Sequence, residues 1–199
     1  MRTIQERTGI ARILNLSPQI LAFACWLIFT LVYMVPMSVA AADNPSGATA
    51  KKNGQTLEML IETALVNRGF KPVQYSIWSQ KPQTYPARVV LKNVPYKTIY
   101  EKKGRTEFVL KGPNLGGDIR IEAKWQQASG SLDERLPYLY LNASRFDTMP
   151  EAHVVIVIDG SGWRDGAIKW LRNAAQNAPQ GKHIEVMDLG QFLAWTNRL

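Results

Sequence analysis

The amino-acid sequence predicts an α/β fold in which a mixed β-sheet is flanked by helices, so that the core has three layers. The segment KTIYEKKGRTEFVL at 97–110 has the pattern of a β-hairpin. From residue 153 to residue 199, strand and helix patterns alternate. A hairpin pairs its strands antiparallel, whereas strands joined through a helix pair in parallel. The two patterns together therefore predict a mixed sheet covered by helices.

The N-terminal 42 residues of this 199-residue chain differ from the rest and are expected to lie outside the folded core. No charged residue occurs from Ile13 to Ala42, and three arginines precede that stretch. Three interpretations stay open: a signal peptide, a membrane anchor formed by residues 19–41, or a misassigned start with translation beginning near Met37. The last predicts a cytoplasmic protein, and the first two predict export or anchoring in the inner membrane.

Residues 43–53 are expected to be a linker, because they are rich in Asn, Gly, Ser, Ala and Lys, and residues 54–199 are expected to form one domain. The whole chain has a net charge of +8. Of its 24 Lys and Arg, three precede residue 43, and of its 16 Asp and Glu one does, which leaves +6 for the remainder. This charge favours an acidic partner, either nucleic acid or an anionic membrane.

The cysteine and histidine content of the sequence supports neither a disulfide bond nor a metal-binding motif. The chain has a single cysteine, Cys25, so an intramolecular disulfide is excluded and a cysteine-based zinc site is unsupported. The two histidines, His153 and His183, are thirty positions apart and form no metal-binding motif. A structural role is the simpler interpretation of both.

A helix over residues 56–70 opens the predicted domain. Its apolar residues recur at helical spacing, with Thr56 as N-cap and Gly69 as stop. Residues 136–144 fit either a helix or an irregular apolar segment. Strands are expected at 87–94, in both arms of the hairpin around Lys102–Gly104, and at 118–126, 153–159 and 183–188, with later helices at 165–176 and 189–199.

The segment GGDIRIEAKWQQ, residues 116–127, carries the residues best suited to chemistry. Polar and apolar residues alternate through it, so Glu122 and Lys124 lie side by side on one face of a strand. A carboxylate holds a hard divalent cation through its oxygens. A neighbouring lysine orients an attacking water and offsets developing negative charge. This pair is therefore predicted to serve metal-assisted hydrolysis of a phosphodiester.

Other carboxylates must complete such a metal site. Glu107 lies on the preceding hairpin strand, and Glu58 lies on the first helix, with Glu62 one turn further on. Asp118 shares the face of Glu122, but four residues of extended strand separate the two by about 13 Å. Glu107 therefore ranks above Asp118 as the first acidic ligand, although the sequence leaves the choice between them open.

A helix with Gly-x-x-Leu-Glu at 54–58, an acid on a hairpin strand and then Glu-x-Lys resemble the PD-(D/E)xK, or restriction endonuclease-like, nuclease superfamily. The resemblance implies a restriction endonuclease-like core that hydrolyses DNA with Mg²⁺ or Mn²⁺. It implies Glu58, Glu107 and Glu122 as metal ligands, and Glu107, Glu122, Lys124 and Gln126 as catalytic residues. Gln126 would lie beside the scissile phosphate or the metal water. The family's first acid is usually Asp after Pro, whereas Glu107 follows Thr106.

The charge and the motif together thus favour a metal-dependent deoxyribonuclease that acts as an endonuclease. One alternative is a DNA-binding protein with the same fold and no cleavage activity, which the departure at Glu107 motivates. Another is a membrane-anchored scaffold whose basic domain meets anionic lipid. The oligomeric state is left open, with a dimer as one arrangement. The segment IDGSGW at 158–163 lacks a phosphate-loop lysine and is interpreted as a tight turn.

Overall fold

The computed structural model of this protein describes residues 47–128 and 130–199. The predicted hydrophobic segment at 1–42, with its three interpretations, lies outside these residues. Among the described residues, no helix is both long and apolar enough to cross a membrane.

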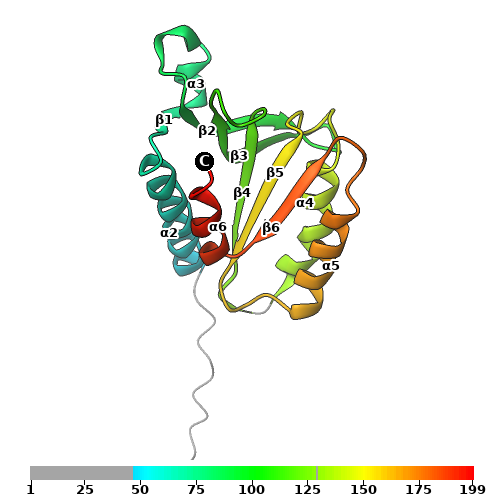
Figure 1. The fold of residues 1–199 in the computed structure, drawn as a ribbon. Coiled ribbons are helices and arrows are strands. Elements are labelled where there is room, and N and C mark those ends of the chain that lie inside the picture. The colour runs from blue at the N-terminus through cyan, green and yellow to red at the C-terminus, as the bar shows by residue number, and fades with distance from the viewer. Residues whose placement is uncertain (1–46, 129) are drawn as a thin grey trace, which may run out of the picture. The chain divides into compact units, whose positions relative to one another are not determined.

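A six-stranded mixed sheet forms the centre of the domain (Figure 1). Its strands follow one another across the sheet in their order along the chain. The first pair is parallel, the next two pairs are antiparallel, and the last two pairs are parallel. The strands are β1 (Lys71–Gln74), β2 (Val89–Lys97), β3 (Lys103–Lys111), β4 (Ile119–Trp125), β5 (His153–Asp159) and β6 (His183–Met187).

Helices cover both faces of the sheet, which confirms the predicted three-layer α/β architecture (Figure 1). On one face, α2 (Gly47–Val66) and α6 (Leu189–Thr196) share a core with apolar residues of β3, β4 and β5. On the other face, α4 (Leu136–Ala143) and α5 (Asp165–Gln176) pack against β5 and β6. The short helix α3 (Tyr75–Trp78) lies beside a third cluster, on β1, β2 and β3. Two 3₁₀ helices, η1 (Pro82–Thr84) and η2 (Ser131–Arg135), complete the set of described helices.

The first helix is longer than predicted. It begins at Gly47, so residues 47–53, which composition assigns to a linker, form its first turns. Alanine and lysine in that stretch have high helix propensity, which explains why the helix extends through it. Thr56 is consequently not an N-cap, and its hydroxyl donates instead to the carbonyl of Lys52 at 3.0 Å. The predicted stop at Gly69 is confirmed, with a φ of 82° just after the helix.

The hairpin of β2 and β3 turns earlier than its sequence predicts. The strands end at Lys97 and resume at Lys103, so the turn centres on Tyr100 and Glu101 rather than on Lys102–Gly104. Gly104 lies within β3, opposite Tyr96. A Cβ at Gly104 would lie 2.6 Å from the Tyr96 ring, so the glycine serves close packing rather than turning.

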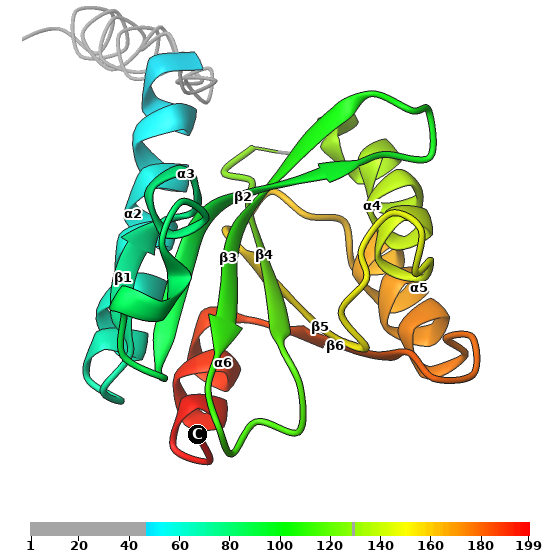
Figure 2. The same cartoon turned by 90° about the horizontal axis from the view of Figure 1, so that it is seen from above.

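The same hairpin changes face halfway along its length. Phe108 packs in the core beside α2, whereas the hydroxyl of Thr106, two residues earlier, contacts side chains on the opposite face of β4. Between these levels Asn93 of β2 has a φ of 58°, which interrupts the regular alternation. The outer half of the hairpin therefore leans over α4 (Figure 2). There the backbone amide of Ile99 donates to Asn142 Oδ1 at 2.9 Å.

Candidate active site

Glu122 and Lys124 lie on the face of β4 that is turned away from α2. Ile121 and Ala123, which alternate with them, are buried in the core against α2. The Lys124 Nζ donates to Glu122 Oε2 at 2.9 Å. The alternation predicted from the sequence therefore brings the carboxylate and the ammonium into direct contact, with Glu122 only 2% exposed.

Glu107 joins this pair from the neighbouring strand. Its Oε1 accepts a hydrogen bond from Lys124 Nζ at 2.9 Å, and its Oε2 accepts one from the backbone amide of Ala123 at 3.1 Å. The hydrogen bond from the Ala123 amide orients the Glu107 carboxylate toward Lys124. Two carboxylates from adjacent strands thus converge on one ammonium group.

A buried network holds Glu122 in place from behind. The hydroxyl of Thr106 donates to Glu122 Oε1 and accepts from Arg120 Nη1. Arg120, 1% exposed, also donates from Nη2 to Glu151 Oε1 at 2.8 Å. The bidentate pair between Arg120 and Glu151 satisfies two buried charges and fixes the orientation of the guanidinium group. Sequence reasoning did not assign Thr106 a role, since only the change of face in β3 brings it here.

Burial and crowding of like charges alter the protonation of this group. Burial, followed by the negative charge of Glu122, raises the pKa of Glu107 to about 7. Burial by itself lowers the pKa of Lys124, but the charges of Glu122 and Glu107 outweigh it and raise the pKa above its usual range. Lys124 is therefore protonated at neutral pH. Burial and the charge of Glu122 also raise the pKa of Tyr96 to about 12, which keeps its hydroxyl neutral.

A cavity of about 350 Å³ opens in front of the three charged groups. Glu107, Glu122 and Lys124 line its floor together with apolar residues of α4. Arg105 and Arg135 line it as well, and both are exposed. Arg105 comes from the hairpin and Arg135 from the segment before α4, and these two parts of the chain meet only in the folded protein. The cavity thus combines carboxylates with cationic groups suited to an anionic ligand.

The carboxylates fit a divalent cation. Glu107 and Glu122 offer hard oxygen donors, and each oxygen retains a second lone pair beside its hydrogen bond. Burial and the negative charge of Glu122 disfavour the ionised form of Glu107 and raise its pKa, although Lys124 offsets part of this effect. A cation at this place would add positive charge and favour the ionised form.

The other predicted site residues lie elsewhere. Glu58 is exposed on α2, which packs on the opposite face of the sheet, and it is not among the cavity-lining residues. Glu62 forms an ion pair with Lys92. Asp118 forms an ion pair with Lys111 and also does not line the cavity, which leaves Glu107 as the acid that meets Glu122.

Gln126 follows β4 and is buried beside residues 160–163, which turn the chain after β5. Its Nε2 donates to the carbonyl of Gly162 at 2.7 Å, and its Oε1 has no hydrogen-bond partner among the described residues. A Cβ at Gly160 would lie 2.2 Å from the Gln126 carbonyl oxygen, so the glycine allows the turn to approach this strand closely. The turn interpretation of IDGSGW agrees with these contacts. The catalytic role of Gln126 stays a prediction.

The fold and site together define a class of protein: a mixed α/β sheet with two acids and a lysine gathered on adjacent central strands. Comparison with protein families finds a match over residues 49–199 to the PD-(D/E)XK nuclease superfamily domain. The chain therefore belongs to the PD-(D/E)XK nuclease superfamily, as the sequence motifs predict. This membership indicates nuclease activity. Comparison with curated proteins and with solved structures identifies no match.

Proposed function

We propose that this protein is a Mg²⁺- or Mn²⁺-dependent nuclease that hydrolyses phosphodiester bonds in DNA, acting as an endonuclease. The observation that carries the proposal is the contact of Lys124 Nζ with both Glu107 and Glu122 at 2.9 Å on the floor of one cavity. Membership of the nuclease superfamily supports the reaction class.

Glu107 and Glu122 would hold the divalent cation. When bound, it supplies positive charge that stabilises the negative charge developing on the phosphate during hydrolysis. The Ala123 amide orients Glu107, and Thr106 orients Glu122, so both ligands are held before a cation arrives. Such prior ordering lowers the entropic cost of assembling the site.

Lys124 acts as a hydrogen-bond donor in this proposal. Because its pKa is raised, its ammonium group stays protonated at neutral pH and is not poised to accept a proton from water. It instead orients the attacking water through a donated hydrogen bond and offsets negative charge on the phosphate oxygens. The test of this role is the loss of turnover rather than of substrate affinity.

Positive charge supports a nucleic acid as the substrate. The chain carries a net charge of +8, and Arg105 and Arg135 flank the acidic floor of the cavity. Guanidinium groups bind phosphate oxygens through charged hydrogen bonds and position a nucleic-acid backbone without reading its sequence. We assign these two arginines to the phosphates beside the scissile bond.

A DNA-binding protein without cleavage activity is the second candidate. It is favoured by one observation: both oxygens of Glu122 already accept hydrogen bonds, from Thr106 and from Lys124. The ion pair between Lys124 and Glu122 can therefore stabilise the fold without binding a metal ion. The two candidates differ in whether bound DNA is cut when metal is supplied.

The deciding experiment incubates full-length protein with supercoiled plasmid and Mg²⁺ or Mn²⁺, and follows nicking and linearisation on a gel. Wild-type protein is expected to cut in at least one metal and to be inactive with chelator. Lys124→Ala and Glu122→Gln are expected to lose cleavage by a factor of about 100 or more while retaining DNA binding. Lys169→Ala and Glu134→Gln, both at exposed positions, are the matched controls.

The outcomes separate cleanly. DNA binding with no cut in either metal would establish the second candidate. Cleavage at wild-type rate by both Lys124→Ala and Glu122→Gln would contradict the assigned site even if the protein is a nuclease. Glu58→Ala and Gln126→Ala, measured alongside, test whether those two residues contribute as the family resemblance implies.

A further inference from the structure

A second cluster of potential ligands lies at the start of the last two strands. His153 Nε2 is 2.8 Å from Glu185 Oε1, and His183 Nε2 is 3.3 Å from the same oxygen. One ligand atom from each of the three residues lies within 4.8 Å of the others. The sequence separates the two histidines by thirty positions and so conceals this convergence.

The backbone, rather than flexible side chains alone, produces the cluster. His153 and His183 are the first residues of β5 and β6, and they are direct partners in the parallel pairing of these strands. Glu185 is two residues beyond His183 and therefore projects from the same face of β6. The His153 ring also packs edge-on against Trp195 of α6, with ring centroids 6.0 Å apart. All three donors are thus directed to one place by the register of the sheet.

The spacing suits a divalent transition metal. In a tetrahedral site with metal–ligand bonds of about 2.0–2.1 Å, the ligand atoms are about 3.3 Å apart. The two histidine nitrogens lie 2.8 Å and 3.3 Å from Glu185 Oε1, and all three ligand atoms lie within 4.8 Å of one another, so small movements of the side chains would admit such an ion. Two imidazoles and one carboxylate favour ions such as Zn²⁺ over Mg²⁺ or Ca²⁺, which prefer oxygen ligands throughout.

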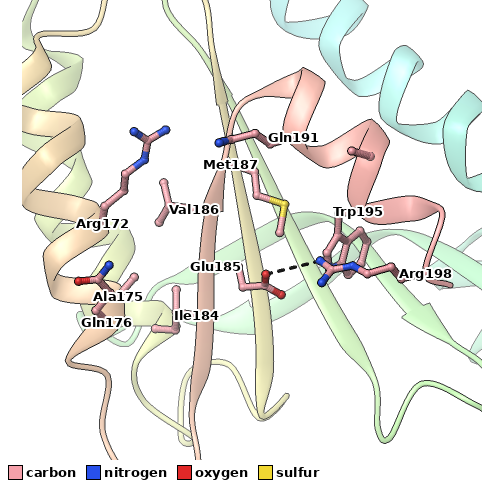
Figure 3. A pocket seen from close by; sticks show the side chains of 11 residues that line it. Arg172, Ala175, Gln176, Ile184, Glu185, Val186, Met187, Gln191, Trp195 and Arg198 are labelled. Atoms are coloured by element: carbon pink, nitrogen blue, oxygen red, sulfur yellow. Dashed lines mark ion pairs between the residues drawn. The ribbon is translucent and has the colours of Figure 1, made fainter.

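Arg198 contacts the carboxylate oxygen of Glu185 that does not face the histidines. Arg198 Nη2 lies 3.9 Å from the other carboxylate oxygen of Glu185, Oε2, on the side of the groove along β6 between α5 and α6 (Figure 3). Glu185 reaches from β6 toward Trp195 and Arg198 in that view (Figure 3). Arg198 therefore forms a long ion pair with Oε2, while Oε1 faces the histidines.

This cluster is separate from the nuclease cavity. His153 pairs with Ile119 of β4, five positions before Lys124, which is about 16 Å along a strand. His153 also faces α6, whereas Glu122 and Lys124 are on the face turned away from α2 and α6. The two groups therefore lie at opposite ends and on opposite faces of the sheet.

The geometry points to a second metal site, in which His153, His183 and Glu185 bind one Zn²⁺-class transition-metal ion that joins the edge strand β6 to β5. His183 is exposed, so the ion would have access from solvent and a free coordination position. Its bonds would stabilise the sheet edge that lies farthest from β1. This site is independent of the proposed nuclease activity.

The test measures Zn²⁺ binding to full-length protein freed of metal by chelator. The Glu122→Gln background disables the nuclease site, so that only the second cluster is measured. One equivalent of Zn²⁺ is expected to bind by calorimetry, and Co²⁺ is expected to give a visible absorption band of a low-symmetry site. At about 100 times the dissociation constant, Zn²⁺ should raise Tm by about 5 °C or more.

His183→Ala and Glu185→Gln, each added to that background, are expected to weaken Zn²⁺ binding by a factor of about 10 or more and to remove the cobalt band. Glu134→Gln, at an exposed position, is the matched control. Unchanged Zn²⁺ affinity in both variants, or the absence of one-equivalent binding in the background protein, would overturn the proposal. Plasmid cleavage by His183→Ala with Mg²⁺ reports separately on the nuclease assignment.

Discussion

Glu107→Gln tests the electrostatic description of the cavity most directly. Burial and the charge of Glu122 raise the pKa of Glu107 from 4.5 to about 7 in the folded protein. The folded state therefore binds more protons than the unfolded state between these values. By linkage, this group lowers the free energy of unfolding as pH rises through that window. Glutamine keeps the shape of the neutral acid and carries no charge. The free energy of unfolding of the variant therefore does not fall through this group as pH rises.

The size of the effect follows from the shift. At about 1.4 kcal/mol per pKa unit, the full shift corresponds to about 3 kcal/mol. The Glu107 side chain is 19% exposed, so solvent screens part of the repulsion. Between pH 5 and pH 8 we therefore expect Glu107→Gln to gain about 1–2 kcal/mol of stability relative to wild type.

Urea denaturation with chelator present gives the free energy of unfolding of both proteins at pH 5 and at pH 8. The gain is the increase, from pH 5 to pH 8, in the free energy of unfolding of Glu107→Gln relative to wild type. Glu134→Gln, an exposed carboxylate, is the control and should show no such change. Adding Mn²⁺ at pH 8 should stabilise wild type and leave Glu107→Gln nearly unaffected. A difference between variant and wild type that is equal at both pH values, or that reverses sign, would refute this account of Glu107.

Three further outcomes are expected. Arg120→Met leaves the carboxylate of Glu151 buried without its partner and should lower the free energy of unfolding by about 3–5 kcal/mol in urea titrations; a loss below about 1 kcal/mol would contradict the network. Gly104→Ala forces a Cβ against the Tyr96 ring and should cost about 1–3 kcal/mol, less in a Tyr96→Ala background; equal costs in both would show that the ring is not the obstacle. Single-turnover cleavage at a Mg²⁺ concentration below saturation should fall as pH drops below about 7, because protons compete with the cation for Glu107; a flat profile from pH 8 to pH 5 at that Mg²⁺ concentration would argue against Glu107 as a ligand.

Much of the fold is predictable because its signals are local. The five consecutive aliphatic residues of β5 are fully or nearly fully buried, as a strand covered on both faces requires. The helix expected at 165–176 is present as Asp165–Gln176. Overall composition misplaced the start of α2, because the Ala and Lys residues of the expected linker have high helix propensity and extend the helix. The turn of the β2–β3 hairpin was misplaced because Gly104 packs against the Tyr96 ring within β3 instead of turning the chain.

Parts of the candidate site depend on contacts that no local pattern encodes. Thr106 reaches Glu122 only because β3 changes face at the level of Asn93 in the paired strand β2. The only sign of this change in the sequence is an asparagine within the β2 segment. Arg105 and Arg135 meet at the cavity because the hairpin leans over α4. Glu58, in contrast, has the expected sequence spacing but lies on a helix that covers the other face of the sheet.

The sequence by itself determined which side chains share a strand face, because backbone geometry alternates side chains with a period of two wherever a strand forms. Glu122 and Lys124 are neighbours for that reason. Only the tertiary structure decided which strands and faces meet, because burial of the apolar core selects the order and register of the strands. It brought Glu107 to Lys124, and it set His153 beside His183, a pairing that thirty intervening residues hide.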